Sequence, residues 1–407
     1  MLTSSLRISL TRQIGRNRTF RRYSALRSQI TLNETQRLTL NTDRDSKMLI
    51  ERDIEQSTPL LSAATSTHAF EKHPPSRPTM ISQERTAQIF PDPSFTRIRH
   101  ATTRRLPQSI AHRGYKALYP ENTMTAFKAA LHEGGAHAIE TDIHLTRDDV
   151  VVLSHDPNLK RCFGREEKII DCDWQFLSSL QTLKEPRSPM PQLRDLLQYI
   201  AQPEHKNIWI LLDIKLDNDS EEVMRLIAKT LAEVDPGPNP WRNRVVLGIW
   251  AAKFLPLCVQ YLPNFPVAYI GFSTCYARQF FKVPNVGFNM FQKTLLGPIG
   301  AKFISNTKKS NRPVYFWTVN EVSMMKWSVQ QGVDGVITDD PKTFNEVCDN
   351  WDDSAPAVRP SLGQWLYTFW LYIILALFSI PLRHRMTGSV DKFLKTERAK
   401  LRLKLDS

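Results

Sequence analysis

Short apolar runs alternate with amphipathic stretches from Pro107 to about Asn350. Helical patterns lie between many of these runs, as in "TMTAFKAALHEG", where Met124 and Phe127 share one face and Gly134 marks a stop. This alternation predicts a parallel α/β fold, and the number of repeats favours a (β/α)8 TIM barrel over an open sheet. The candidate strands are "SIAHR", "AIETDI", "VVVLSHD", "NIWILLDIK", "VVLGIW", "VAYIGFS", "NVGFNMF", "PVYFWTVN" and "GVITDD".

The first part of the chain lacks this pattern. Residues 1–33 contain seven arginines and no acid before Glu34, a composition typical of mitochondrial transit peptides, although a basic leader without an address would look the same. The stretch from Thr35 to Arg105 is polar and rich in Ser, Thr, Arg and Pro, which indicates a linker or disorder. We therefore assign 1–105 to a disordered basic leader and linker, and 106–350 to the barrel domain.

A different segment follows the barrel region. Residues 360–382, "PSLGQWLYTFWLYIILALFSIPL", contain no charge and are bounded by Arg359 and "RHR". Their length and their early Trp and Tyr residues predict a single transmembrane helix, with a buried core helix as the alternative. Residues 383–407 hold eight Lys or Arg and three acids, so they form either a basic amphipathic tail on an anionic membrane or a solvated charged helix.

Charge and cysteine content narrow the choice of partners. A net charge of +13 on 407 residues suggests anionic partners. Because the basic residues concentrate in the termini and the barrel region lacks a stacking-aromatic motif, we expect no nucleic-acid partner. The five cysteines have no C-x-x-C spacing, which predicts unpaired thiols in a reduced compartment, with a Cys162–Cys172 pair as the alternative. The oligomeric state stays open.

Polar residues recur where the candidate strands end. Ligand sites of parallel barrels lie at the carboxyl ends of the strands, so the recurrence predicts a site, although any one pair alone is more often structural. The pairs are His112 and Arg113, Glu140 and Asp142, His155 and Asp156, and Asp213 and Lys215.

These residue types suit phosphodiester cleavage. Glu140 and Asp142 are two apart and point to the same side of a strand, and Asp213 would complete an all-oxygen cluster for Mg²⁺ or Ca²⁺. Two histidines can serve as general base and general acid. Arg113 and Lys215 offer positive charge to phosphate oxygens.

Six motifs in order resemble the glycerophosphodiester phosphodiesterase family of TIM-barrel enzymes: "HRGYKALYPENTMTAF", "IETDIHLT", "VVLSHD", "LLDIK", "WTVN" and "GVITDDP". The resemblance extends from about Ser109 to Cys348. Within the family, the phosphatidylglycerol-specific phospholipase C branch is most similar, with "GIW" at 248–250 in place of its "GLW".

The resemblance implies a role for each matching residue. Many family members have glutamate where Asp213 stands, so the third ligand is one methylene shorter here. Trp317 either contacts the glycerol moiety or packs the rim, and Asp339 and Asp340 are expected to cap a helix. The implied roles are His112 and His155 as acid/base pair, Glu140, Asp142 and Asp213 as metal ligands, and Arg113, Lys215, Glu121 and Trp317 as substrate-binding residues.

The expected function is metal-dependent cleavage of phosphatidylglycerol, a membrane glycerophospholipid, to diacylglycerol and glycerol phosphate. Alternatives are soluble glycerophosphodiesters, N-acylethanolamine phospholipids and, in another class, a silent barrel that binds anionic lipid. The expected location is a mitochondrial membrane, or else the endoplasmic reticulum or lipid droplets.

Overall fold

The computed structural model describes residues 89–97, 106–354, 356–382 and 388–405. In the helix that begins at Leu362, side chains are described as far as Leu375. The predicted leader and most of the predicted linker lie outside the described residues.

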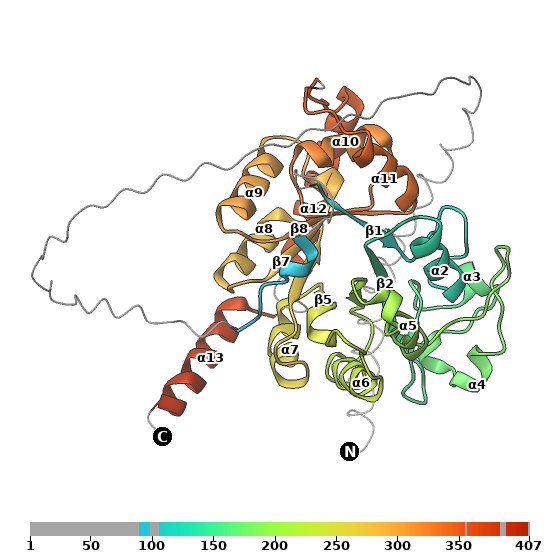
Figure 1. Cartoon of the computed structure of the whole chain (residues 1–407). Helices are drawn as coiled ribbons and strands as arrows, with labels where there is room; N and C mark the ends of the chain where they lie inside the picture. The colour runs from blue at the N-terminus through green and yellow to red at the C-terminus, as the bar shows by residue number, and fades with distance from the viewer. Residues whose placement is uncertain (1–88, 98–105, 355, 383–387, 406–407) are drawn as a thin grey trace, which may run out of the picture. The chain divides into compact units, whose positions relative to one another are not determined.

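Eight parallel strands form a closed barrel, as the sequence pattern predicts (Figure 1). Each strand pairs with the next around the ring, and β1 closes it by pairing with β2. The helices surround the strands in Figure 1. The barrel strands are β1 (Gln108–His112), β2 (Ala138–Leu145), β4 (Trp209–Ile214), β5 (Val245–Ile249), β6 (Val267–Gly271), β7 (Gly287–Phe291), β8 (Val314–Trp317) and β9 (Gly335–Thr338).

A ninth strand, β3 (Val151–Leu153), differs from the prediction because it runs antiparallel to β2 and lies outside the ring. We expected "VVVLSHD" to behave as the other strands do. Instead β2 extends past the barrel rim, and the hairpin at Thr146–Val150 turns the chain back, so that the backbone N–H of Ser154 reaches the carbonyl oxygen of Asp142 (3.0 Å). The pattern missed this because a short apolar run looks the same in either direction.

Helices connect the strands in the expected alternation. The helix predicted in "TMTAFKAALHEG" forms as α2 and is capped by Thr123, whose hydroxyl accepts the N–H of Ala126 (3.2 Å). The helices of the barrel are α2 (Met124–His132), α5 (Leu193–Ile200), α6 (Ser220–Glu233), α7 (Leu255–Tyr261), α8 (Thr274–Ala277), α9 (Pro298–Lys309), α10 (Val322–Gln330) and α11 (Pro341–Asp349). Short 3-10 turns are η3 (Pro203–His205), η4 (Trp241–Asn243), η5 (Ala252–Phe254), η6 (Arg278–Lys282) and η7 (Gln292–Thr294).

The barrel interior is apolar at its lower end and polar at its mouth. Because side chains alternate along a strand, Trp209 and Leu211 of β4 face the same side as Asp213, one layer apart. Trp209 and Leu211 belong to an inner apolar cluster with Tyr315. A larger apolar layer between strands and helices completes the core.

Residues 89–97 close the lower end, although they lie within the stretch that we predicted to be a linker. Phe90 is buried, and the ring of Phe95, in η1 (Ser94–Arg97), packs edge-on against Trp209 at 5.9 Å. Thr96 accepts a hydrogen bond from the hydroxyl of Tyr315 (2.8 Å). We call residues 89–97 the plug.

A small lobe stands between β3 and α5. It has its own apolar cluster, which includes Leu159, Ile169 and Leu177. We call residues 157–190 the insert lobe; its helices are α3 (Lys160–Phe163), η2 (Ile169–Asp171) and α4 (Trp174–Leu177). All five cysteines of the chain, Cys162 and Cys172 included, are free thiols in the structure.

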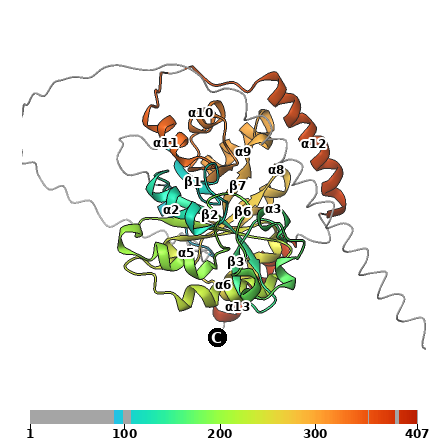
Figure 2. The same cartoon turned by 90° about the vertical axis from the view of Figure 1, so that its right-hand side faces the viewer.

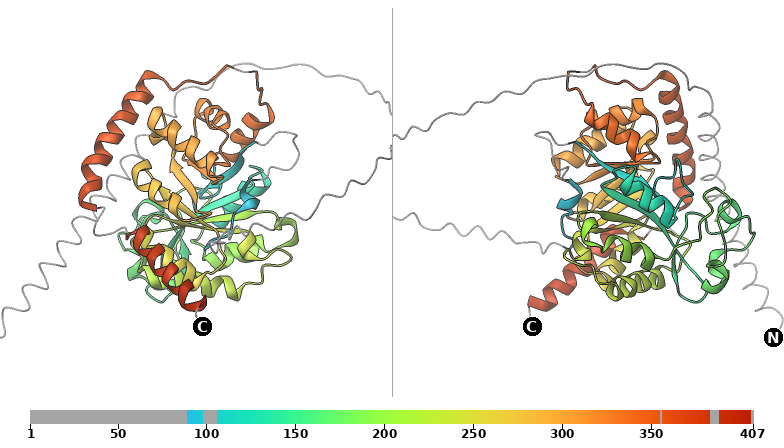
Figure 3. Two further views of the ribbon diagram at one scale, coloured as in Figure 1. Left: turned by 90° about the vertical axis from the view of Figure 1, so that its left-hand side faces the viewer. Right: turned by 45° about the vertical axis from the view of Figure 1, so that its right-hand side comes forward.

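Two helices follow the barrel, α12 (Leu362–Leu382) and α13 (Val390–Leu405). Among the residues that the structure describes, we find no helix with both the length and the apolar character needed to span a bilayer, so the predicted transmembrane segment is not found. The start of α13 packs on the barrel: Val390 and Phe393 are buried, and Phe393 stacks on Phe90 of the plug (6.4 Å). α12 and the insert lobe lie on the same side of the barrel (Figures 2 and 3).

Candidate active site

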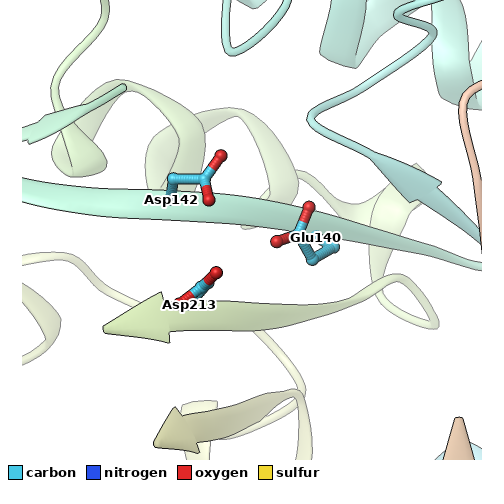
Figure 4. Close-up of side chains that lie close together, drawn as sticks. All are labelled: Glu140, Asp142 and Asp213. Atoms are coloured by element: carbon cyan, nitrogen blue, oxygen red, sulfur yellow. The ribbon is translucent and has the colours of Figure 1, made fainter. Parts of the chain in front are cut away.

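Three carboxylates meet inside the barrel mouth (Figure 4). Parallel pairing places Asp142 of β2 directly beside Asp213 of β4, and Glu140 lies two residues before Asp142 on the same face. One oxygen of each lies within 4.8 Å of the others, and all three side chains are buried. The sequence predicted these three residues as one cluster, and the structure brings them together.

Three buried carboxylates so close together cannot all stay ionised without positive charge nearby. Burial, followed by the charges of Asp142 and Asp213, raises the pKa of Glu140 well above its usual value. The Lys215 ammonium lies 2.5 Å from Asp142 and 2.6 Å from Asp213. A buried set of oxygen donors that needs positive charge fits a hard divalent cation such as Mg²⁺ or Ca²⁺.

Neighbouring groups fix the orientation of two of these carboxylates. The indole N–H of Trp250 donates to Asp213 (2.6 Å), and the Asn122 amide donates to Asp142 (2.9 Å). Such outer hydrogen bonds hold metal-ligating oxygens in place. The "GIW" motif alone does not predict that the indole of Trp250 reaches across to the neighbouring strand.

His112 ends β1 and pairs with a carboxylate from the last strand turn. Its Nδ1 lies 2.6 Å from Asp339 Oδ1. Burial, reinforced by Arg113, lowers the pKa of His112 to about 4, so the imidazole is neutral at pH 7. With its Nδ1–H donating to Asp339, His112 leaves Nε2 as the proton acceptor.

Asp339 therefore differs from the helix-capping role that we expected for it. Although burial opposes ionisation, Lys116 and His112 hold the pKa of Asp339 well below its usual range. The Asn320 amide also donates to it (2.9 Å). Asp340 does cap α11, accepting the N–H of Thr343 (3.0 Å).

His155 reaches the mouth on the β2–β3 hairpin. Its Nδ1 lies 2.8 Å from Asp156 Oδ1, so each histidine of the predicted pair has a carboxylate partner. The second oxygen of Asp156 accepts from Arg161 of α3 (2.7 Å). Arg161 lies outside every sequence motif, so no local pattern predicts this contact.

Arg113 follows β1 with a left-handed backbone, at φ 60°. Its N–H donates to the carbonyl oxygen of Glu140 (2.9 Å), and its guanidinium lies 3.2 Å from Asp142. Gly114 is required next, because it has φ 82° and a Cβ there would lie 2.7 Å from the backbone of Ala126. A strained residue held beside the carboxylates is typical of a functional site.

Glu121, predicted to bind substrate, has both oxygens engaged by arginines. One oxygen accepts from Arg113 (2.9 Å), and Arg161 contacts both, at 2.7 and 2.8 Å. Burial opposes ionisation, yet these two guanidinium groups lower the pKa of Glu121 far below its usual value. Glu121 is thus placed to orient Arg113.

Aromatic rings form one wall of the mouth, opposite the carboxylates in strand order. Trp317 ends β8, and its ring lies 5.1 Å from both Phe272 and Phe291 and 5.8 Å from Trp250. Its indole N–H donates to the carbonyl oxygen of Asn289 (3.0 Å). Packing on the rim is therefore observed, and contact with glycerol stays a prediction.

Comparisons with known proteins place the chain among phosphodiesterases of one family. The model of the glycerophosphoryl diester phosphodiesterase family matches residues 112–343, more than half of the chain. A glycerophosphodiester phosphodiesterase of Bacillus altitudinis is 26% identical over 57% of this chain and 94% of its own length. Human lysophospholipase D GDPD1 is 27% identical over 60% of this chain and 87% of its own.

Solved structures share the fold. A glycerophosphoryl diester phosphodiesterase from Silicibacter pomeroyi, described as putative, superposes with a TM-score of 0.55, at 19% identity over 63% of this chain and 96% of that one. A phosphodiesterase of Oleispira antarctica, solved with the product sn-glycerol-3-phosphate, has a TM-score of 0.53 at 21% identity, over 60% of this chain and 98% of that one.

Proposed function

The chain belongs to the glycerophosphoryl diester phosphodiesterase family and is a phosphoric diester hydrolase, and from that premise we propose that it cleaves phosphatidylglycerol to diacylglycerol and glycerol phosphate. The observation that carries the proposal is the buried cluster of Glu140, Asp142 and Asp213 beside two carboxylate-paired histidines. A divalent cation held by that cluster would supply positive charge to the phosphoryl oxygens.

His112 acts as the general base in the proposed mechanism. Because it is neutral and its Nδ1–H is held by Asp339, Nε2 takes the proton of the headgroup hydroxyl next to the phosphate. That hydroxyl oxygen bonds to phosphorus as the bond to diacylglycerol breaks. His155 delivers a proton to the leaving oxygen.

Water then opens the resulting cyclic phosphate. His155 accepts the proton of the water, and His112 returns its proton to the glycerol hydroxyl, so both histidines end as they began. Arg113 offers its planar fork to the phosphoryl oxygens, and Lys215 adds a point charge. The intramolecular nucleophile gives a large proximity advantage, while direct attack by water is the rival route.

Soluble glycerophosphodiesters are the second candidate substrate. The observation that favours them is the product sn-glycerol-3-phosphate in the Oleispira antarctica protein. A catalytically silent barrel that binds anionic lipid is the candidate from another class. It predicts binding of phosphatidylglycerol without turnover.

The test is a lipid assay of the purified full chain with phosphatidylglycerol vesicles, with and without chelator. We expect diacylglycerol and glycerol phosphate, no product from His155→Ala, and no product after chelation. Phosphatidic acid with free glycerol would contradict the bond that we propose to break. Equal turnover of a headgroup without the adjacent hydroxyl would refute the cyclic route.

A mitochondrial membrane remains the proposed location. The arginine-rich residues 1–33, which lie outside the described residues, support this location. The proposed substrate supports it as well, because phosphatidylglycerol is expected in mitochondrial membranes. Deleting 1–33 and locating the protein in cells tests the address. Unchanged mitochondrial targeting would contradict it.

A further inference from the structure

The large apolar side chains that the described residues expose gather at the mouth end of the barrel. Loops after the strands, the first turns of the following helices and the insert lobe all lie at this end. Among the described residues, every exposed large apolar side chain lies in one of these segments or in α12, except Leu403 of α13. The mouth-end residues are Leu118, Ile170, Leu183, Ile299 and Val322, with Leu362, Trp365, Leu366, Tyr367, Phe369 and Trp370 of α12.

α12 turns Thr368, Tyr372 and the buried Leu371 toward the barrel and keeps most of its large apolar side chains outward. The Thr368 hydroxyl donates to the carbonyl oxygen of Lys293 (2.8 Å), and the Tyr372 hydroxyl to that of Thr294 (2.6 Å). Leu366, Phe369 and Trp370 are 56%, 62% and 61% exposed. A surface helix of a water-soluble domain usually buries its apolar side and exposes its polar side. The outward side of α12 instead exposes large apolar side chains to water.

This face adjoins the mouth. α12 contacts η7, which directly follows Phe291 at the end of β7, and Phe291 belongs to the aromatic wall. The ring of Trp365 lies so close over Gly297 that a Cβ there would be 2.9 Å from it. Apolar surface thus extends from the aromatic wall to α12.

Lysines stand among the apolar groups of the same rim. Lys116 lies 3.3 Å from Asp339 at the edge of the site. Lys184 of the insert lobe donates to the carbonyl oxygens of Lys116 and Tyr119 (2.9 Å each). Lys293 lies over the Tyr367 ring at 5.5 Å. Apolar groups interleaved with lysine are typical of surfaces that enter the headgroup region of anionic bilayers.

We propose that the mouth face, defined as Leu118, Leu183 and the outward side of α12, docks on a bilayer that contains anionic glycerophospholipid. α12 lies in the interface with Leu366, Phe369 and Trp370 among the acyl chains, and the barrel mouth opens toward the headgroups. The inference rests on the proposed function in taking a lipid as the substrate. It adds the surface through which that substrate is reached.

The experiment compares the full chain with the triple variant Leu366→Ser, Phe369→Ser and Trp370→Ser. The matched control is Leu403→Ser, which removes an exposed apolar side chain of α13. Each protein is mixed with phosphatidylcholine vesicles with and without phosphatidylglycerol, and bound protein is measured by flotation. Turnover of vesicle phosphatidylglycerol and of soluble glycerophosphoglycerol is measured in parallel, together with thermal unfolding.

We expect the triple variant to bind the anionic vesicles about 100-fold more weakly and to lose vesicle turnover in proportion, because three large apolar groups no longer leave water. Soluble turnover and unfolding temperature stay the same, and the control behaves as the unmodified chain. Unchanged vesicle binding by the triple variant would overturn the proposal. The proposal would also be overturned if the unmodified chain formed a dimer, and the triple variant were monomeric but still bound vesicles.

Failure of the proposed substrate gives a different result. If phosphatidylglycerol is never cleaved but the triple variant still loses vesicle binding, the docking face stands and the substrate assignment falls. If phosphatidylglycerol is cleaved equally by both proteins, the docking face falls and the substrate assignment stands.

Discussion

Replacing Asp339 with asparagine should slow catalysis without unfolding the protein. The carboxylate accepts from Nδ1 of His112 at 2.6 Å and thereby leaves Nε2 as the base. A hydrogen bond to a charged group contributes about 1.5–3 kcal/mol. If this bond is needed most in the transition state, its loss lowers kcat/KM by about 10- to 150-fold.

The pH profile gives the same substitution a second signature. His112 is competent as a base only when neutral, so kcat/KM of the unmodified enzyme falls as the pH decreases through about 4. The charge and hydrogen bond of Asp339 raise the pKa of His112 against the effect of burial. Asparagine removes that charge, so the acid limb of the profile moves to lower pH.

The neighbouring carboxylate provides the matched control. Asp340 caps α11 through the N–H of Thr343, and asparagine caps helices equally well. Asp340→Asn should therefore keep both kcat/KM and the unfolding temperature. Steady-state kinetics against pH on a soluble substrate measure both variants. An Asp339→Asn enzyme with full kcat/KM and an unmoved acid limb would refute the role of Asp339.

Three further outcomes follow from other contacts. Glu140→Gln should raise the concentration of Mg²⁺ or Ca²⁺ needed for half-maximal activity about 10- to 100-fold after chelation, because one charged oxygen donor is lost; unchanged metal titration would contradict the cluster. Arg161→Gln should lower kcat/KM about tenfold, because both Glu121 and Asp156 lose a hydrogen-bond donor. The control Arg165→Gln removes an exposed pair with Glu167 and should leave kcat/KM unchanged. Equal kinetics of the two variants would exclude Arg161 as a positioning residue. Arg244→Met should cost about 3 kcal/mol of unfolding free energy, since the buried guanidinium donates to the carbonyl oxygens of Ile208 and His205; thermal melts beside the exposed Arg242→Met check it, and equal melting would contradict that reasoning.

The barrel and the carboxylate cluster were predictable because both follow from strand periodicity. An apolar run with Glu140 and Asp142 two residues apart places both carboxylates on one face, and parallel pairing then brings Asp213 beside Asp142. No tertiary information beyond the fold class is needed. His112 was predictable for the same reason, as the last residue of its strand.

The rest of the site depends on contacts that no local pattern carries. Trp250 follows the neighbouring strand β5 and donates to Asp213. Asp339 contacts His112 although the two lie near opposite ends of the domain's sequence. Arg161 lies in an insertion whose packing on the barrel had no signal in the periodicity. His155 was placed correctly at the mouth, but through an antiparallel hairpin in place of a barrel strand.

The plug has a consequence for how the chain can be shortened. Phe90 packs inside the domain and stacks on Phe393. Two segments that lie far apart in the sequence therefore stabilise each other at the lower end of the barrel. A truncation that keeps residues 89–97 preserves this contact, whereas one that starts at residue 98 or later removes Phe90. A protein trimmed to the family motifs, about 109–348, would lose both Phe90 and Phe393, and the lower end of the barrel, where Phe95 packs on Trp209, would meet water.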